Sequence, residues 1–80
     1  MVMGHVESAH VGPHPDRLGY VTELTYSYSV QGSYYSGVHQ EFHRREREAE
    51  AAADQYRGTA VLVQYDPSRH SESVLGQPRQ

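Results

Sequence analysis

Two histidines flank a glutamate in the segment His39-Gln-Glu-Phe-His43, and imidazole nitrogens are common zinc ligands, with bonds of about 2.1 Å. On a β-strand, however, positions four apart are separated by about 13 Å, because a strand rises about 3.3 Å per residue. Only a helical segment would let His39 and His43 share a metal, and their order differs from the His-Glu-x-x-His pattern of zinc proteases. We expect no metal and no cofactor here, and His39 and His43 remain the metal candidates of a rival hypothesis.

A second group of reactive residue types, Asp66, Ser68 and His70, lies within one short stretch. A hydrolytic triad needs its histidine between the nucleophile and the orienting carboxylate, and neighbouring positions of a turn do not present three groups in that series. Asp66 stands before Pro67, which is typical of a turn in which the aspartate accepts a bond from a backbone N–H. We therefore expect no catalytic residue, and we expect that the chain is not an enzyme.

Arginines and tyrosines offer two further kinds of surface. Arg44, Arg45 and Arg47 could bind phosphate. However, Glu48 stands three residues after Arg45, and Glu50 stands three residues after Arg47, so ion pairs on a helix surface are expected. Five tyrosines could stack bases, as on sheets that bind single-stranded nucleic acid, but we favour core packing: Tyr20, Tyr26, Tyr28, Tyr34 and Tyr35. The formal net charge of −3 gives no general attraction to phosphate backbones, so nucleic acid is not an expected partner.

The size of the chain bounds its architecture. Its 80 residues form one domain, residues 1–80, and a chain of this length buries only about 60 to 65 per cent of its unfolded surface. A shallow or edge-on binding surface is therefore expected. The longest apolar run is Ala60–Val63, so no membrane span is expected in this chain. A complete chain would then be cytoplasmic, and a domain excised from a membrane-anchored protein would be extracytoplasmic.

The stretch 19–43 predicts a long β-hairpin. Large residues recur at every second position from Tyr20 to Val30, with polar residues between them. A two-residue turn at Gln31-Gly32 pairs Val30 with Ser33, Tyr28 with Tyr35 and Tyr26 with Gly37. A three-residue loop would instead bury Tyr34, Val38 and Phe42. We favour the first register near the turn, followed by a bulge after Gly37 that returns Val38 and Phe42 to the core.

The remaining segments surround this hairpin. Alanines and a tyrosine at helical spacing predict a helix that begins near Arg44 and ends before Gly58, with one apolar stripe: Ala49, Ala52, Ala53 and Tyr56. We expect three further strands. The strand Met3–Val11 should lie at an edge of the sheet, and the strand Thr59–Tyr65 should be central and buried on both faces. A short final strand should span Ser71–Leu75. Residues 12–19 are a loop and the expected disordered segment, and residues 76–80 are a tail.

These elements predict an α+β fold that is mainly antiparallel β. Four to five strands form a small curved sheet or open barrel with one α-helix packed on it, in the order β-β-β-α-β and then a short β. The motifs are Tyr26-x-Tyr28-x-Val30-x-Gly32-x-x-Tyr35-x-Gly37, a helix ending Tyr56-x-Gly58, Val61-x-Val63-x-Tyr65-Asp66-Pro67 and Ser73-Val74-Leu75. Over residues 18–76 they resemble the DUF3592 family of bacterial domains of unknown function. The resemblance implies no established catalytic residues. It also implies that the β-rich part lies outside the cytoplasm, because members are often flanked by transmembrane helices.

The leading hypothesis for function is a non-catalytic interaction or accessory module. Its partner would be another protein or a second copy, bound by strand addition at the first strand, around Val6. Tyr34 or Tyr35, whichever the register leaves outside, would contribute a contact. The alternatives are an enzyme that acts on a small ligand or uses a metal through its histidines, and a single-stranded nucleic-acid binder.

Overall fold

The computed structural model describes residues 1–76 of the chain. Its elements are β1 (Val2–Pro13), β2 (Tyr20–Val30), β3 (Ser33–His43), α1 (Glu46–Tyr56), β4 (Ala60–Asp66) and β5 (Arg69–Leu75). The strands form one antiparallel sheet in the order β3-β2-β1-β4-β5, which curls into a nearly closed barrel. The predicted α+β class, the strand-rich order and the single helix are therefore confirmed.

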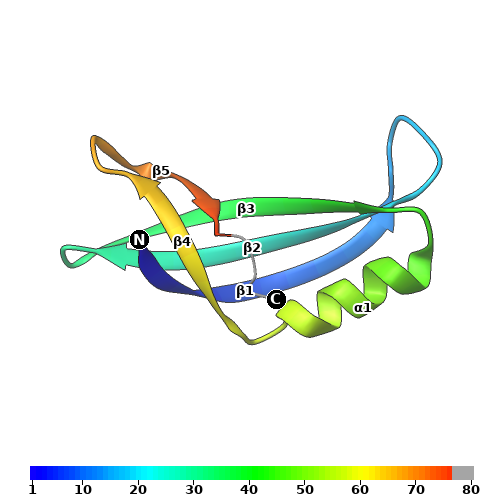
Figure 1. Cartoon of the computed structure of the whole chain (residues 1–80), viewed down its shortest axis with the longest axis horizontal. Coiled ribbons are helices and arrows are strands. Elements are labelled where there is room, and N and C mark those ends of the chain that lie inside the picture. The colour runs from blue at the N-terminus through cyan, green and yellow to red at the C-terminus, as the bar shows by residue number, and fades with distance from the viewer. Residues whose placement is uncertain (77–80) are drawn as a thin grey trace.

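The long strands β1, β2 and β3 run along the molecule, with the β4–β5 hairpin near one end and α1 near the other (Figure 1). The β4–β5 hairpin and α1 cover the same face of β2, which we call the inner face. Tyr26, Tyr28 and Val30 pack with Val63 of β4, whereas Leu24 packs with Ala53 of α1. The opposite, outer face has no helix or strand packed over it in the described residues. The core is therefore a single layer between the long strands and these two covers.

β2 follows the predicted alternation along its whole length. Its even positions from 22 to 30 are buried, and its odd positions are half-buried or exposed. Thr22 is the one polar side chain among them, and its hydroxyl donates to the carbonyl oxygen of Ala49 at 2.9 Å. This bond satisfies the buried hydroxyl and attaches α1 to the centre of the sheet.

Tyrosine side chains, rather than backbone bonds, complete the barrel between β3 and β5. The hydroxyl groups of Tyr26 and Tyr28 cross the interior from β2 to β5, where they bond to Ser73 Oγ, at 2.9 Å, and to the carbonyl oxygen of His70. The ring of Tyr28 also stacks between Tyr35 and Tyr65, with centroid distances of 5.7 and 6.4 Å. Each ring thus buries apolar area while its hydroxyl finds a partner.

The hairpin register is as predicted near the turn. Gln31 and Gly32 both have positive φ, 53° and 84°, as a two-residue type I′ turn requires. Val30 pairs with Ser33, Tyr28 with Tyr35 and Tyr26 with Gly37. The ring of Tyr26 lies directly over Gly37, where a side chain would overlap it.

The bulge predicted after Gly37 is absent, and that prediction is wrong. The β2–β3 register continues without a shift to Tyr20 and His43. Val38 and Phe42 therefore point to the outer face, where they are 60% and 43% exposed. The uninterrupted ladder keeps every backbone bond, and it places His39, Glu41 and His43 inward instead, where they meet α1.

The first strand is longer than predicted, and its first part is not an edge. β1 pairs with β2 from Gly4 to Pro13 and with β4 from Val2 to His5. Val6 is only 7% exposed, and its N–H donates to the carbonyl oxygen of Thr59 at 3.0 Å. The prediction that β1 is the open edge is therefore wrong, because the chain returns after α1 to add β4 beside it. The sheet edges are β3 and β5.

The helix and β4 agree with the prediction in part. α1 begins at Glu46, two residues later than expected, and Ala49 and Ala53 are fully buried while Ala52 and Tyr56 are only partly so. β4 is central, between β1 and β5, but it is buried on one face only. Ala60, Leu62 and Gln64 on its outer side are exposed among the described residues, so the expectation of burial on both faces is wrong.

The connecting segments are shorter than expected. The loop after β1 spans only residues 14–19, because Pro13 still pairs with Tyr20. The final strand begins at Arg69 instead of Ser71. Gly76 still donates its N–H to Leu62, and the rest of the predicted tail, residues 77–80, lies outside the described residues. No helix in residues 1–76 has the length and apolar character needed to cross a membrane.

Candidate functional site

The inner face carries a polar cluster formed by His39, Glu41, His43 and Tyr56. β3 presents the first three from alternate positions, and Tyr56 comes from the last turn of α1. The Tyr56 hydroxyl donates to Glu41 Oε2 at 2.8 Å, and His39 Nε2 lies 3.1 Å from the same oxygen. His43 Nε2 lies 3.7 Å from Glu41 Oε1. The half-buried carboxylate of Glu41 therefore lies close to three polar side chains.

The cluster changes the acidity of two of its members. Burial alone would raise the pKa of Glu41, but the hydrogen bonds from Tyr56 and His39, together with the charges of both imidazoles, lower its pKa below 4.5. Burial, and then the hydrogen bond to Glu41, raises the pKa of Tyr56 from 10.0 to about 12. The arrangement therefore favours an ionised Glu41 beside a neutral Tyr56.

This cluster joins β3 to the end of α1. In residues 1–76, no group of three or more His, Cys, Asp or Glu side chains is arranged to hold a metal ion. His39 and His43 share one strand face, as predicted, but they approach different oxygens of Glu41. Tyr56 was the partner that sequence reasoning missed, because it is 15 positions away along the chain. Its bond ties the end of α1 to β3.

Glu41→Gln should lower the melting temperature by about 4–8 °C at pH 7, corresponding to about 1 kcal/mol for a domain of this size. The folded state lowers the pKa of Glu41, so its stabilising effect is present above pH 4.5 and is lost as the pH falls through the folded-state pKa. The difference between the variant and the parent should therefore shrink below pH 4.5. Thermal melts of both proteins from pH 3 to pH 8 measure this difference in melting temperature.

Glu23→Gln is the matched control for this series. Glu23 also accepts a hydrogen bond, from Gln40 at 2.8 Å, but it lies exposed on the outer face. Its substitution should change the melting temperature little at any pH. If both variants gave the same pH profile, the inner cluster would have no specific role in stability.

Asp66, Ser68 and His70 do not assemble into a catalytic group. Asp66 Oδ1 accepts the backbone N–H of Ser68 at 2.8 Å, which is the predicted turn role. The ring of His70 packs edge-on against Tyr65 and Tyr35, with centroid distances of 5.3 and 6.0 Å. The histidine thus lies among the aromatic residues that complete the barrel.

The tyrosines divide between core and surface. Tyr26 and Tyr28 are buried, and Tyr35 packs on the inner face against Tyr28. Tyr34 is 83% exposed on the outer face, so it is the tyrosine that the register leaves outside. Val6, the third predicted binding residue, is buried within the sheet and has no surface to offer a partner.

The expected ion pairs along α1 are absent from the described residues. The ion pairs there are those of Glu41 with the two histidines and of Arg57 with Asp54. Arg44, Arg45 and Arg47 are exposed and contact neither Glu48 nor Glu50 as ion pairs. This end of the molecule therefore carries guanidinium groups that remain open to solvent.

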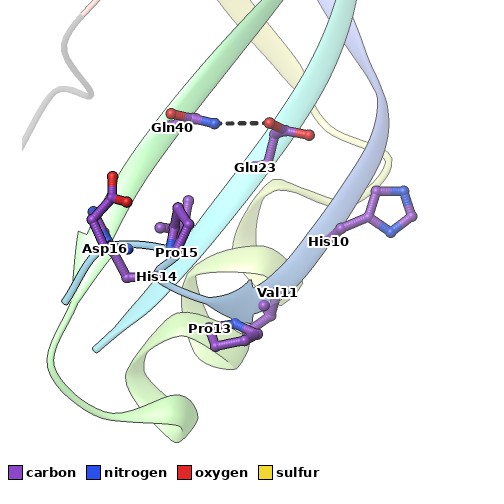
Figure 2. Close-up of a pocket in the computed structure, with 10 residues that line it drawn as sticks. His10, Val11, Pro13, His14, Pro15, Asp16, Glu23 and Gln40 are labelled. Carbon is purple, nitrogen blue, oxygen red and sulfur yellow. Dashed lines mark hydrogen bonds between the residues drawn. The ribbon is translucent and has the colours of Figure 1, made fainter. Parts of the chain in front are cut away.

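A hollow of about 490 Å³ lies on the outer face beside the loop 14–19. Gln40 of β3 donates to Glu23 of β2 across it, while His14, Pro15 and Asp16 project from the loop (Figure 2). His10 points away from the Glu23–Gln40 pair (Figure 2). The polar groups do not converge on one point, so the hollow has no evident catalytic arrangement.

Phe42 organises the loop that sequence reasoning expected to be disordered. The ring of His14 meets it edge-on at 5.3 Å, and the Arg17 guanidinium lies 4.5 Å from its centroid. Gly19 has φ of +124°, and a Cβ there would come within 2.6 Å of the Phe42 ring. Glycine tolerates both a positive φ and a close approach of the backbone, so Gly19, directly before β2, was the available sequence signal.

The comparisons with known proteins give one match. No curated protein matches the chain, and no solved structure does. The family described as Domain of unknown function (DUF3592) matches residues 2–80, which extends the predicted resemblance to include β1. Because this match covers nearly the whole chain, the protein belongs to the DUF3592 family of domains of unknown function.

Proposed function

We propose that this chain is a non-catalytic interaction module that binds an extended polypeptide segment along the free edge of β3. The observation that carries the proposal is the edge itself. β3 is an 11-residue strand, and among residues 1–76 it has a hydrogen-bonded neighbour, β2, on one side only. Such an edge offers unpaired N–H and C=O groups to an added strand.

The turn decides which backbone groups face outward. In a two-residue hairpin the closing pair, here Val30 and Ser33, is hydrogen-bonded, and the pattern then alternates along the ladder. The residues whose backbone groups point away from β2 are Tyr34, Ser36, Val38, Gln40 and Phe42. All five side chains are exposed on the outer face. A strand added there would lie beside a row of side chains that is uncharged and in part apolar.

Natural edge strands are usually protected by charges, prolines, bulges or short length, and the outward positions of β3 carry none of these features. The register of β3 has no shift, and none of its outward positions is charged or proline. The other edge strand, β5, is shorter, with 7 residues, and exposes Arg69 and Glu72. The part of β1 beyond β4 ends at Pro13, and Arg57 already donates to the carbonyl oxygen of Ala9.

The second half of β3 is the favoured part of the edge. β5 lies near the first half, where His70 packs on Tyr35. From Val38 to Phe42 no such neighbour is present among the described strands. An extended segment of about five residues could pair there and place apolar side chains beside Val38 and Phe42.

Val38→Pro should abolish binding of an extended peptide, because proline removes an outward N–H from the edge. Ligands would come from a random linear peptide library selected against the folded chain. Their titration into the ¹⁵N-labelled protein should shift the amides of Val38, Gln40 and Phe42 first. Sedimentation velocity on the free chain tells whether a second copy is the bound segment.

Val38→Thr is the matched control, since threonine keeps both the β-branched shape and the backbone donor. It should retain binding within a few-fold. Equal binding by the proline variant, once circular dichroism shows it is folded, would rule out pairing along β3. Pairing along β3 would also be ruled out if the selected peptides shifted only the amide resonances of residues in other elements.

A further inference from the structure

A second hollow, at the end of the sheet, combines two arginines with an apolar floor. It has a volume of about 410 Å³ and is lined by Arg17, Leu18, Gly19, Phe42 and Arg44. Its lining residues come from the loop between β1 and β2 and from the end of β3. These two segments lie at the same end of the molecule (Figure 1). Its size is within the range of ligand-binding clefts, at the small end.

The loop that forms one wall is held in place. The N–H of His14 donates to the carbonyl oxygen of Gly19 at 2.9 Å, and the N–H of Asp16 donates to Nδ1 of His14 at 3.0 Å. These bonds close the loop, and the contact between Gly19 and the Phe42 ring fixes it to β3. A wall held in this way costs little ordering entropy when a ligand binds.

The charges of the hollow are positive and unpaired. Arg17 lies over the ring of Phe42, and neither it nor Arg44 takes part in an ion pair in residues 1–76. The acids nearest in sequence, Asp16 and Glu46, do not line the hollow. The whole chain has a net charge of −3, so this positive site is a local feature and not a general excess of basic residues.

We propose that this hollow binds one anionic group, carboxylate or phosphate, that is carried next to an aromatic or aliphatic group. A guanidinium presents parallel donors that match both anions, and the contact with the Phe42 ring positions Arg17 at the hollow. Phe42, 43% exposed, and Leu18, 95% exposed, supply apolar area that the neighbouring group of the ligand would cover. The hollow shares Phe42 with the edge of β3, but the two arginines that would bind the anion lie outside that strand.

Amide NMR titrations of the ¹⁵N-labelled chain test the ligand class. Phenyl phosphate and benzoate present the two anions on the same ring, inorganic phosphate lacks the ring, and benzamide lacks the charge. We expect saturable amide shifts at Leu18, Gly19 and Phe42 with phenyl phosphate, with benzoate, or with both. Inorganic phosphate should bind at least several-fold more weakly, and benzamide should not saturate. The stronger of the two ring-bearing anions identifies carboxylate or phosphate as the preferred group.

Arg44→Gln should weaken the binding of that anion about tenfold while leaving the fold unchanged, because Arg44 is exposed. Arg47→Gln removes the same charge from α1, outside the hollow, and should change binding less than twofold. An equal loss in both variants, or saturable binding of benzamide, would overturn the proposal. Val38→Pro should leave anion binding intact, so failure of strand pairing and failure of this site are distinguishable.

Discussion

Ala53→Glu should unfold the domain or lower its free energy of unfolding by several kcal/mol, because it places a charge in the core without a partner. Ala53 is fully buried and packs with Ala9 and Leu24. Its small side chain allows α1 to approach the sheet closely, and the buried members of that cluster are all apolar. A domain of this kind has only about 5–15 kcal/mol of stability in total, so the variant is expected to be largely unfolded.

Ala51→Glu is the control, since Ala51 is exposed on the same helix and has the same helix propensity. It should change stability by less than about 0.5 kcal/mol. Ala52, which the sequence pattern also placed on the stripe, is half-buried, so Ala52→Glu should fall between the two. Urea unfolding followed by circular dichroism measures all three. Equal effects at positions 51 and 53 would contradict the observed orientation of α1.

Gly37→Ala should destabilise the chain by about 1–3 kcal/mol, the usual cost of overpacking a core. The added Cβ would overlap both Cζ and the hydroxyl oxygen of Tyr26. Tyr26 is fully buried, and its hydroxyl is bonded to Ser73, so the ring cannot move aside without breaking the closure between β2 and β5. The loss would appear as a lower urea midpoint.

Gly12→Ala is the matched control, because Gly12 also lies in a strand but a Cβ there meets nothing within 4 Å. It should be neutral or stabilise the chain by up to about 1 kcal/mol, through reduced freedom of the unfolded state. A double-mutant cycle with Tyr26→Leu should show coupling, since the shorter side chain makes room at position 37. Additive effects of Gly37→Ala and Tyr26→Leu would mean that the strain lies elsewhere.

Local patterns accounted for much of the fold. The alternation along β2, the turn at Gln31-Gly32 and the helical spacing of Ala49 and Ala53 were all readable, because each depends on neighbours within a few positions. The pairing of Tyr26 with Gly37 followed directly from the turn. The order of the elements was sufficient for the α+β class.

The candidate sites were less predictable. The sequence placed His39, Glu41 and His43 on one face of a strand, but the bond from Tyr56 to Glu41 depends on where α1 packs. The contact of Arg17 with Phe42 joins positions 25 residues apart, across a loop expected to be disordered. Contacts of this kind depend on a register maintained along whole strands, which no short motif encodes.

The sequence alone determined which residues share a face, because the periods of two and 3.6 follow from backbone geometry. It did not determine what covers each face or which strands stand at the edges. Phe42 was expected inside because it is large and apolar, yet the unbroken ladder with β2 turned it outward, where the loop 14–19 partly covers it. β1 was expected at an edge, yet β4 joins it from beyond α1. Both outcomes depend on pairings between distant segments, and the free energy of those pairings is set only when the whole sheet assembles.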